Sequence, residues 1–134
     1  MKPEDYKPGN WVLVLGEARQ IEGISNRLRP DCGYFQFFGI TAWLKGIHVQ
    51  PIPLTEEILL ANNWTKTVRD NGDIRYSHDE SYYDVAKHGT KFPFVFESEG
   101  SATTYYICHD RMVHDFQNSF YMLNNKRNLS LTIK

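Results

Sequence analysis

Residues 110–134 read DRMVHDFQNSFYMLNNKRNLSLTIK, and the spacing of apolar side chains changes once along this stretch. In the first half they recur at helical spacing, at Val113, Phe116, Phe120 and Leu123. Asp110 is suited to cap such a helix, and Lys126 and Arg127 follow at its negative end. From residue 129 onward apolar and polar residues alternate, which is the period of a half-buried strand. The stretch therefore predicts a helix packed on a sheet, followed by a final strand.

A second, shorter helix is predicted at residues 53–63. Thr55 can cap its first turn, and the two acidic residues that follow suit the positive end of the helix dipole. Asn62 or Asn63 can supply the left-handed residue that ends it. A helix of about two turns is not stable alone, so we expect it to pack on the sheet.

The rest of the chain has the sequence pattern of short strands separated by turns. Segments rich in aromatic and β-branched residues lie between Gly, Pro and Asn; they are 11–15, 18–24, 34–38, 40–44, 47–49, 64–69, 74–78, 92–96 and 103–108. The Asn71-Gly72 pair predicts a tight hairpin. Pro93 makes 92–96 an expected edge strand. Residues 26–33 and 79–89 are expected to be a loop and a surface excursion.

Composition limits the possible classes of protein. The chain has 134 residues and a formal net charge of -1, so no global field attracts nucleic acid or an anionic membrane. Residues 1–6 hold no apolar signal segment, and the longest aliphatic run, residues 12–15, is too short to span a bilayer. We expect a cytoplasmic protein with a single domain over 1–134, in which a β-meander at 1–53 precedes the other elements at 54–134.

The two cysteines carry little functional signal. Cys32 and Cys108 lie far apart without CxxC spacing, which argues against a zinc ribbon or a dithiol redox motif. Two free thiols in a reducing compartment and one disulfide are both compatible with the sequence.

Three segments together carry a resemblance. PIPLTEEIL at 51–59, HDFQNSFY at 114–121 and LSL at 129–131 resemble a family of small uncharacterised bacterial proteins, many of them related to phages or mobile elements. That family has a PLTxExL helix and a C-terminal helix of HxLQNxxF/Y type. Phe116 stands where the family has leucine, and Leu123–Lys126 departs from its small-residue helix ending. The resemblance implies the architecture and the genetic context, and it implies no activity.

The C-terminal helix carries the candidate polar site. His114, Gln117 and Asn118 take adjacent helix positions, where they either bind a ligand or satisfy backbone groups at the helix–sheet junction. The pairs His109-Asp110 and His114-Asp115 are spaced by five residues, which on a helix turns the two histidines about 140° apart. Hence no metal ion is expected there, and no cofactor is predicted.

A second candidate surface lies in the N-terminal half. The basic residues Arg27, Arg29 and Lys45 lie among aromatic residues, including Trp43, as on surfaces that bind single-stranded nucleic acid. Alternating aromatics in strands can equally form a core.

The expected fold is α+β: a mostly antiparallel sheet or partly open SH3-like barrel with a short central helix, a longer C-terminal helix and a final strand. The sequence has no GxSxG elbow, Cys–His signature or phosphate-binding glycine loop, so no enzyme is predicted. The predicted function is that of an accessory protein acting through protein contacts. A nucleic-acid-binding module is the alternative, and a small-ligand hydrolase is the third hypothesis.

Overall fold

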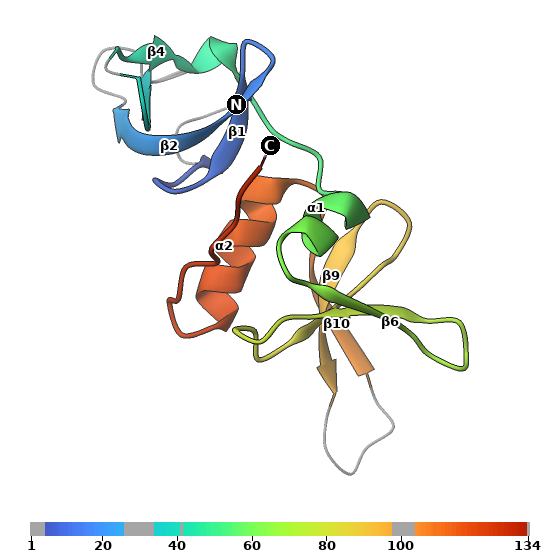
Figure 1. Cartoon of the computed structure of the whole chain (residues 1–134). Coiled ribbons are helices and arrows are strands. Elements are labelled where there is room, and N and C mark those ends of the chain that lie inside the picture. Colours follow the sequence, from blue (N-terminus) through green and yellow to red (C-terminus); the bar gives the residue numbers. More distant parts are fainter. Residues whose placement is uncertain (1–4, 26–33, 41, 98–103, 134) are drawn as a thin grey trace. The chain divides into compact units, whose positions relative to one another are not determined.

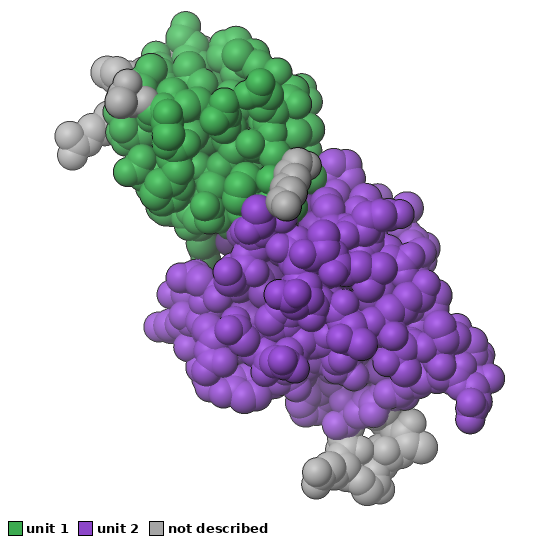
Figure 2. Space-filling model, viewed as in Figure 1, with its two compact units in different colours: residues 1–52, 133–134 green, residues 53–132 purple. Residues whose placement is uncertain are grey.

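The chain has an α+β fold with two antiparallel sheets, shown in Figure 1 as a computed structural model that describes residues 5–25, 34–40, 42–97 and 104–133. It divides into two compact units (Figure 2): unit 1 comprises Met1–Ile52 with Ile133–Lys134, and unit 2 comprises Pro53–Thr132. This division lies next to the predicted boundary between residues 53 and 54. The expectation of one domain over 1–134 stays a prediction.

Unit 1 is the predicted β-meander. Its strands are β1 (Trp11–Val14), β2 (Glu17–Ser25), β3 (Tyr34–Phe37), β4 (Leu44–Lys45) and β5 (Val49–Gln50), arranged in the order β4-β3-β2-β1-β5. The strand predicted at 40–44 is wrong, because Leu44 alone among its described residues, 40 and 42–44, belongs to a strand. The strand predicted at 47–49 is largely the 3-10 turn η2 (Gly46–His48). The predicted loop at 26–33 lies outside the described residues.

A tight turn and an alternating pattern explain the first hairpin. Leu15 and Gly16 join β1 to β2 with backbone φ angles of 51° and 85°, the paired positive values of a type I′ turn. Along β1, Val12 and Val14 are buried, whereas Trp11 and Leu13, which alternate with them, are only partly buried. The valines enter a core with Ile21, Phe35 and Phe37 among others. Unit 1 therefore buries one face of its sheet.

Unit 2 contains the second sheet. Its strands are β6 (Thr65–Val68), β7 (Ile74–Ser77), β8 (Asp84–Ala86), β9 (Phe92–Glu97) and β10 (Thr104–Asp110), in the order β10-β9-β8-β7-β6. The Asn71-Gly72 hairpin between β6 and β7 is confirmed, and Gly72 has the positive φ, 89°, that this turn requires.

Two predictions about this sheet are wrong. The surface excursion at 79–89 contains β8, a strand of three residues that is too short to show an alternating pattern. In addition, β9 is an interior strand between β8 and β10, although it contains Pro93. The register of β10 shifts between Ile107 and Asp110, opposite Pro93. The proline therefore lies at an irregular point of the ladder, where its missing N–H removes no regular pair.

The two helices are α1 (Glu56–Ala61) and α2 (Val113–Leu123). Thr55 caps α1 as predicted, since its Oγ1 accepts a hydrogen bond of 3.3 Å from the Ile58 N–H. Asn63, with φ 69°, supplies the left-handed residue after it. Asp110, the predicted cap of α2, belongs to β10 instead, and the residue before the helix is Met112.

The final strand is not formed, although its apolar alternation is real. Leu129 and Leu131 are each 6% exposed, yet residues 127–133 pair with no described strand. The segment is held in another way, by the side chain of Asn62, which donates to the Thr132 C=O over 3.0 Å and accepts from the Thr132 N–H over 2.7 Å. A buried side-chain amide thus replaces a strand partner.

Both helices contact the same face of the unit 2 sheet. Phe94 of β9 stacks on Phe116 of α2 with ring centroids 5.1 Å apart and an interplanar angle of 12°. On β7, the hydroxyl of Tyr76 donates to a carboxylate oxygen of Glu56 in α1 over 3.1 Å. Tyr76 and Phe94 belong to one cross-strand row through Val85, and all three are fully buried. The opposite face of the sheet carries the polar residues described next.

Candidate functional site

Arg75 is the centre of the sheet face that points away from the helices. Successive strand residues point to opposite faces, so Arg75 is turned away from the core that Tyr76 enters. Its side chain is nevertheless only 5% exposed. Buried arginine is rare unless it is paired, so the groups around its guanidinium determine how it is accommodated.

Two carboxylates and one further arginine surround the Arg75 guanidinium. Nη1 donates to Glu97 Oε1 over 3.0 Å, and Arg69 Nη1 donates to the same oxygen over 3.1 Å. The hydrogen bond from Arg75 is the main reason that the pKa of Glu97 lies below its usual value. Asp73 Oδ2 lies 3.9 Å from Arg75 Nη2, which is too long for a hydrogen bond.

One donor of the Arg75 guanidinium is left over. Nε is buried and has no hydrogen-bond partner among the described residues. A buried donor without a partner costs about 1–3 kcal/mol. Arg75 is therefore only partly satisfied by its neighbours in the sheet.

Arg75 also contacts an aromatic ring from a distant strand of the same sheet. Arg75 lies on β7 and Tyr106 on β10, two strands that are separated by β8 and β9. Strand spacing of about 4.8 Å would place them roughly 14 Å apart in a flat sheet. The Arg75 Cζ atom is nonetheless 5.9 Å from the centre of the Tyr106 ring. The two side chains therefore reach toward each other across β8 and β9, at a distance that favours an attractive cation–π contact.

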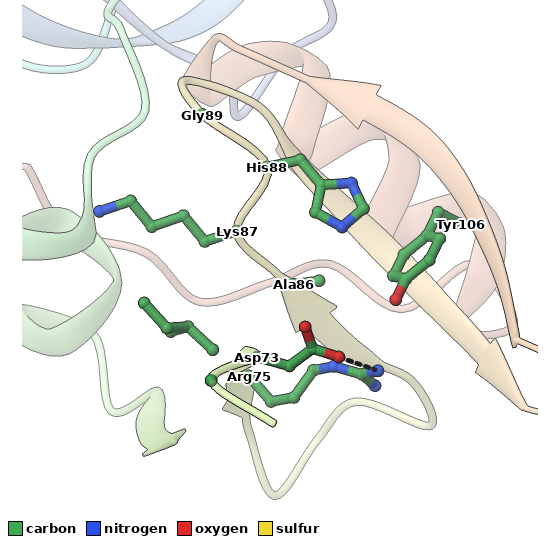
Figure 3. Close-up of a pocket in the computed structure, with 9 residues that line it drawn as sticks. Asp73, Arg75, Ala86, Lys87, His88, Gly89 and Tyr106 are labelled. Atoms are coloured by element: carbon green, nitrogen blue, oxygen red, sulfur yellow. Dashed lines mark ion pairs between the residues drawn. The ribbon is translucent and has the colours of Figure 1, made fainter. Parts of the chain in front are cut away.

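The first hollow on this face, here called the His88 hollow, has a volume of about 230 Å³. Its lining includes Asp73, Arg75, Lys87, His88 and Tyr106. Figure 3 shows the His88 and Tyr106 rings side by side above Arg75, with Lys87 directed away from them. The two ring centroids are 4.4 Å apart. The hollow thus combines a guanidinium, an imidazole and a phenol with one carboxylate.

The position of His88 follows from a tight turn. Its N–H donates to the Lys91 carbonyl over 2.9 Å, and the Lys91 N–H donates back to the His88 carbonyl over 3.0 Å. Gly89 begins the turn with a φ of 63°, a value that glycine adopts without strain. This two-residue turn between β8 and β9 fixes where the imidazole enters the hollow.

The second hollow, here called the Phe96 hollow, also borders Arg75, and its lining combines Tyr83 and Phe96 from the sheet face of Phe94 with Asp84 and Glu97 from the face of Arg75. Its volume is about 360 Å³, and Tyr82, Tyr83, Asp84, Phe96 and Glu97 are among the residues that line it. Tyr82 is 63% exposed and Phe96 is 44% exposed. The rings of Tyr83 and Phe96 are 5.9 Å apart, and Tyr105 continues the row 6.4 Å beyond Phe96.

The two hollows differ in charge. The Phe96 hollow holds two carboxylates, of which Glu97 pairs with two arginines and Asp84 makes no side-chain ion pair among the described residues. The His88 hollow has more donors than acceptors. The first arrangement, with its carboxylates and nearby aromatic residues, suits a cation, and the second suits an anion.

The predicted polar cluster lies elsewhere, on α2. His114 and Gln117 are 2% and 8% exposed, and Asn118 is half-buried. His114 Nε2 lies 3.3 Å from Asp115 Oδ1 of the same helix. A binding role for these residues stays a prediction, and the burial of two of them favours the alternative in which they satisfy groups at the helix–sheet junction.

The two predicted His-Asp pairs are on different elements. His109 is exposed in β10, whereas His114 is buried in α2. Among residues 5–25, 34–40, 42–97 and 104–133, no three His, Cys, Asp or Glu side chains are grouped as a metal ion would require. Cys108 carries a free, half-buried thiol, and Cys32 lies outside the described residues.

The ionisation of the Asp110 carboxyl is expected to affect the stability of unit 2. Burial is the main reason that its pKa is raised from 3.8 to about 6. The folded state therefore holds the proton more tightly than the unfolded state, so stability falls as the pH rises from about 4 to 6. Asp110→Asn is expected to raise the unfolding free energy by about 1 kcal/mol at pH 7. A two-unit shift corresponds to about 2.7 kcal/mol, reduced here because the carboxyl is partly exposed to solvent.

Urea unfolding at pH 4 and pH 7 measures this gain, which should vanish at the lower pH. The matched control is Asp79→Asn, at an exposed carboxylate of the same unit. A gain of equal size at both pH values would show that the effect does not come from ionisation of Asp110.

The nucleic-acid candidates lie on unit 1. Trp43 is 46% exposed, and Lys45 is exposed in β4 opposite Tyr34 of β3. The Trp43 ring lies against Gly23, where its Cη2 atom would be 3.2 Å from an added Cβ. Trp43 thus covers a strand position that has no side chain. Arg27 and Arg29 lie outside the described residues.

Sequence reasoning missed the Arg75 face, because its residues come from four strands whose pairing is not readable locally. Arg75, Glu97 and Tyr106 come together only through the strand order β10-β9-β8-β7 and the reach of their long side chains. One signal was present: Arg75 lies between Ile74 and Tyr76 in the hairpin that Asn71-Gly72 predicts, where it points to the face opposite Tyr76.

Comparison with protein-family models, curated proteins and solved structures finds no match to this chain. Within the described part of the chain, no helix has the length and apolar character needed to cross a membrane.

Proposed function

We propose that this chain is a non-enzymatic accessory protein that binds a protein partner through the Phe96 hollow of unit 2. The hollow would receive a basic side chain, lysine or arginine, of that partner. The observation that carries the proposal is the Asp84 carboxylate, which shares a hollow with Tyr82, Tyr83 and Phe96 and has no cationic side chain paired with it among the described residues.

Aromatic rings and carboxylates together are a favourable environment for a cation. An ammonium or guanidinium group over an aromatic face contributes about 0.5–2 kcal/mol, more when it is desolvated. Exposed Tyr and Phe next to arginine also match the composition of protein interfaces. Arg75 and Arg69 neutralise Glu97, so Asp84 is the carboxylate left for a partner.

The test is calorimetric titration with a short lysine- and arginine-containing peptide, compared with the same peptide in which glutamine replaces the basic residues. We expect the basic peptide alone to bind. Asp84→Asn should weaken binding roughly tenfold, because a hydrogen bond to a charged group contributes about 1.5–3 kcal/mol. Tyr83→Ala should weaken it further by removing a ring.

Glu80→Gln is the control, because Glu80 is an exposed acidic residue near the hollow that does not line it. It should leave the affinity unchanged. Equal loss in Glu80→Gln and Asp84→Asn would show that net charge, and not the hollow, attracts the peptide. Binding of the glutamine peptide would equally contradict a site for basic side chains.

The genetic setting is a second part of the proposal. The resemblance of residues 51–59, 114–121 and 129–131 supports a phage-like or mobile-element origin, and a cytoplasmic location is proposed with it. Neighbouring genes test this part: integrase, capsid or conjugation genes around the coding sequence are expected, and a metabolic operon would contradict it.

A nucleic-acid-binding module is the second candidate function, favoured by exposed Trp43 beside exposed Lys45 on unit 1. Stacking of a base on an aromatic ring contributes about 1–3 kcal/mol. If this surface binds, Trp43→Ala should weaken binding of a single-stranded oligonucleotide at low salt roughly tenfold, and Trp43→Phe should restore part of it. Ile47→Ala, at another exposed apolar position of unit 1, is the control. Absence of any low-salt binding would exclude this function.

A further inference from the structure

We propose that the His88 hollow is a binding site for a phosphate group. It is separate from the Phe96 hollow, and the proposal does not rest on the function assigned to that hollow. The two hollows have only Arg75 in common.

The first argument is the unused edge of the Arg75 guanidinium. Nη1 is engaged by Glu97 at 3.0 Å, whereas Nε has no partner among the described residues and Nη2 has only Asp73 at 3.9 Å. Nε and Nη2 are the two donors of one guanidinium edge, the fork that matches two oxygens of an oxyanion. Asp73 lines the hollow and lies next to Nη2, so the Nη2 end of this edge borders the hollow, while Nε lies buried behind it.

The second argument is burial. The Arg75 side chain is 5% exposed, so its charge is held in place by the sheet before any ligand arrives. A donor edge of this kind is preorganised and is weakly competed for by water. An exposed surface arginine would offer neither property.

The remaining lining residues distinguish phosphate from a carboxylate. A carboxylate has two oxygens, and both would be taken by the Arg75 edge. A phosphate has further oxygens for the Tyr106 hydroxyl and the His88 ring, which Figure 3 shows on the same side of Arg75. Lys87 is directed away from this group and adds only positive charge at the rim.

Asp73 is the natural competitor for the site. Its side chain is 46% exposed, and one of its oxygens accepts a hydrogen bond of 3.2 Å from Asn71 Nδ2 within the hairpin turn. It thus lies near the guanidinium without bonding to it. A bound phosphate would move the Asp73 carboxylate outward into solvent, so removal of this charge should favour phosphate.

The experiment is an NMR titration of the full chain with inorganic phosphate at constant ionic strength, observing the side-chain Nε–H signals of arginine. The measurement reads Arg75 directly and needs no substitution at this buried position. We expect the Arg75 signal to shift saturably with phosphate. Acetate should shift it less, and chloride should not shift it.

Three variants sharpen the result. Asp73→Asn should tighten phosphate binding about threefold, as expected for a partly exposed like charge. His88→Ala should weaken it about threefold to tenfold through loss of one hydrogen bond. Lys126→Gln, the matched control at an exposed lysine of unit 2 that does not line the hollow, should change it less than twofold.

Phenyl phosphate forms a parallel arm that identifies the source of the phosphate group. Tighter binding than inorganic phosphate supports a phosphorylated organic ligand that packs on the His88 and Tyr106 rings, and equal or weaker binding supports free phosphate. An Arg75 signal that does not move, or that moves equally with chloride, would overturn the site. So would Asp73→Asn binding phosphate no better than the natural chain. None of these outcomes depends on whether a basic peptide binds the Phe96 hollow.

Discussion

Phe116→Ala is expected to lower the unfolding free energy of unit 2 by about 3–5 kcal/mol, the usual cost of deleting a buried phenylalanine ring. Phe116 is fully buried, stacks on Phe94 and meets the edge of Trp64 with centroids 5.5 Å apart. The alanine leaves a cavity between α2 and the sheet. Because domains are stable by only about 5–15 kcal/mol, this loss is a large fraction of the total.

Urea unfolding followed by far-UV circular dichroism, with hydrogen exchange of the β9 amides, measures this effect. Met122→Ala is the matched control on the same helix, since Met122 is 69% exposed. We expect it to change the free energy by less than about 0.5 kcal/mol. A loss below about 1 kcal/mol for Phe116→Ala would mean that the Phe94–Phe116 stack does not hold α2 on the sheet.

The apolar residues on the sheet-facing side of α2 explain why this helix could be predicted from sequence. Val113, Phe116 and Phe120 are all fully buried, as their helical spacing requires. Its start was misplaced because Asp110 is a good capping residue by type but pairs with Phe92 in the sheet. Sheet pairing is a long-range interaction, and the local capping signal does not contain it.

The errors in the strands have a related cause. Pro93 argues locally for an edge, yet a register shift in the partner strand gives it an interior place. Leu129 and Leu131 alternate as in a strand and are buried. The backbone of the next residue, Thr132, is nevertheless hydrogen-bonded by the side chain of Asn62, 70 positions earlier, and not by another strand. For residues 129–131 the local pattern reported burial correctly, and in both segments the hydrogen-bond partner was decided elsewhere in the chain.

The Arg75 face extends this argument to function. A buried ion pair is often no more stabilising than apolar residues of the same size, so an arginine held at 5% exposure with an unsatisfied Nε is poorly explained by stability alone. The two hollows differ in charge, and Arg75 lines both of them. For this reason the proposed sites are tested with variants of Asp84, Asp73 and His88, which leave Arg75 in place.

Asn62→Ala is expected to lower the unfolding free energy of unit 2 by about 2–3 kcal/mol, because it removes three hydrogen bonds of about 1 kcal/mol each. The Asn62 amide donates to the carbonyls of Ile58, over 2.8 Å, and of Thr132, over 3.0 Å. Its oxygen accepts the Thr132 N–H over 2.7 Å. Asn62 is 7% exposed, so water replaces these bonds poorly.

The direct readout is hydrogen exchange at the Thr132 N–H, which should change from protected to fast in Asn62→Ala. Ser130→Ala removes an exposed side chain from the same segment and should leave both exchange and stability unchanged. If Thr132 stays protected in Asn62→Ala, another group holds the C-terminal segment. If protection is lost without loss of stability, burial of Leu129 and Leu131 contributes nothing to unit 2, and the segment is an appendage to the fold.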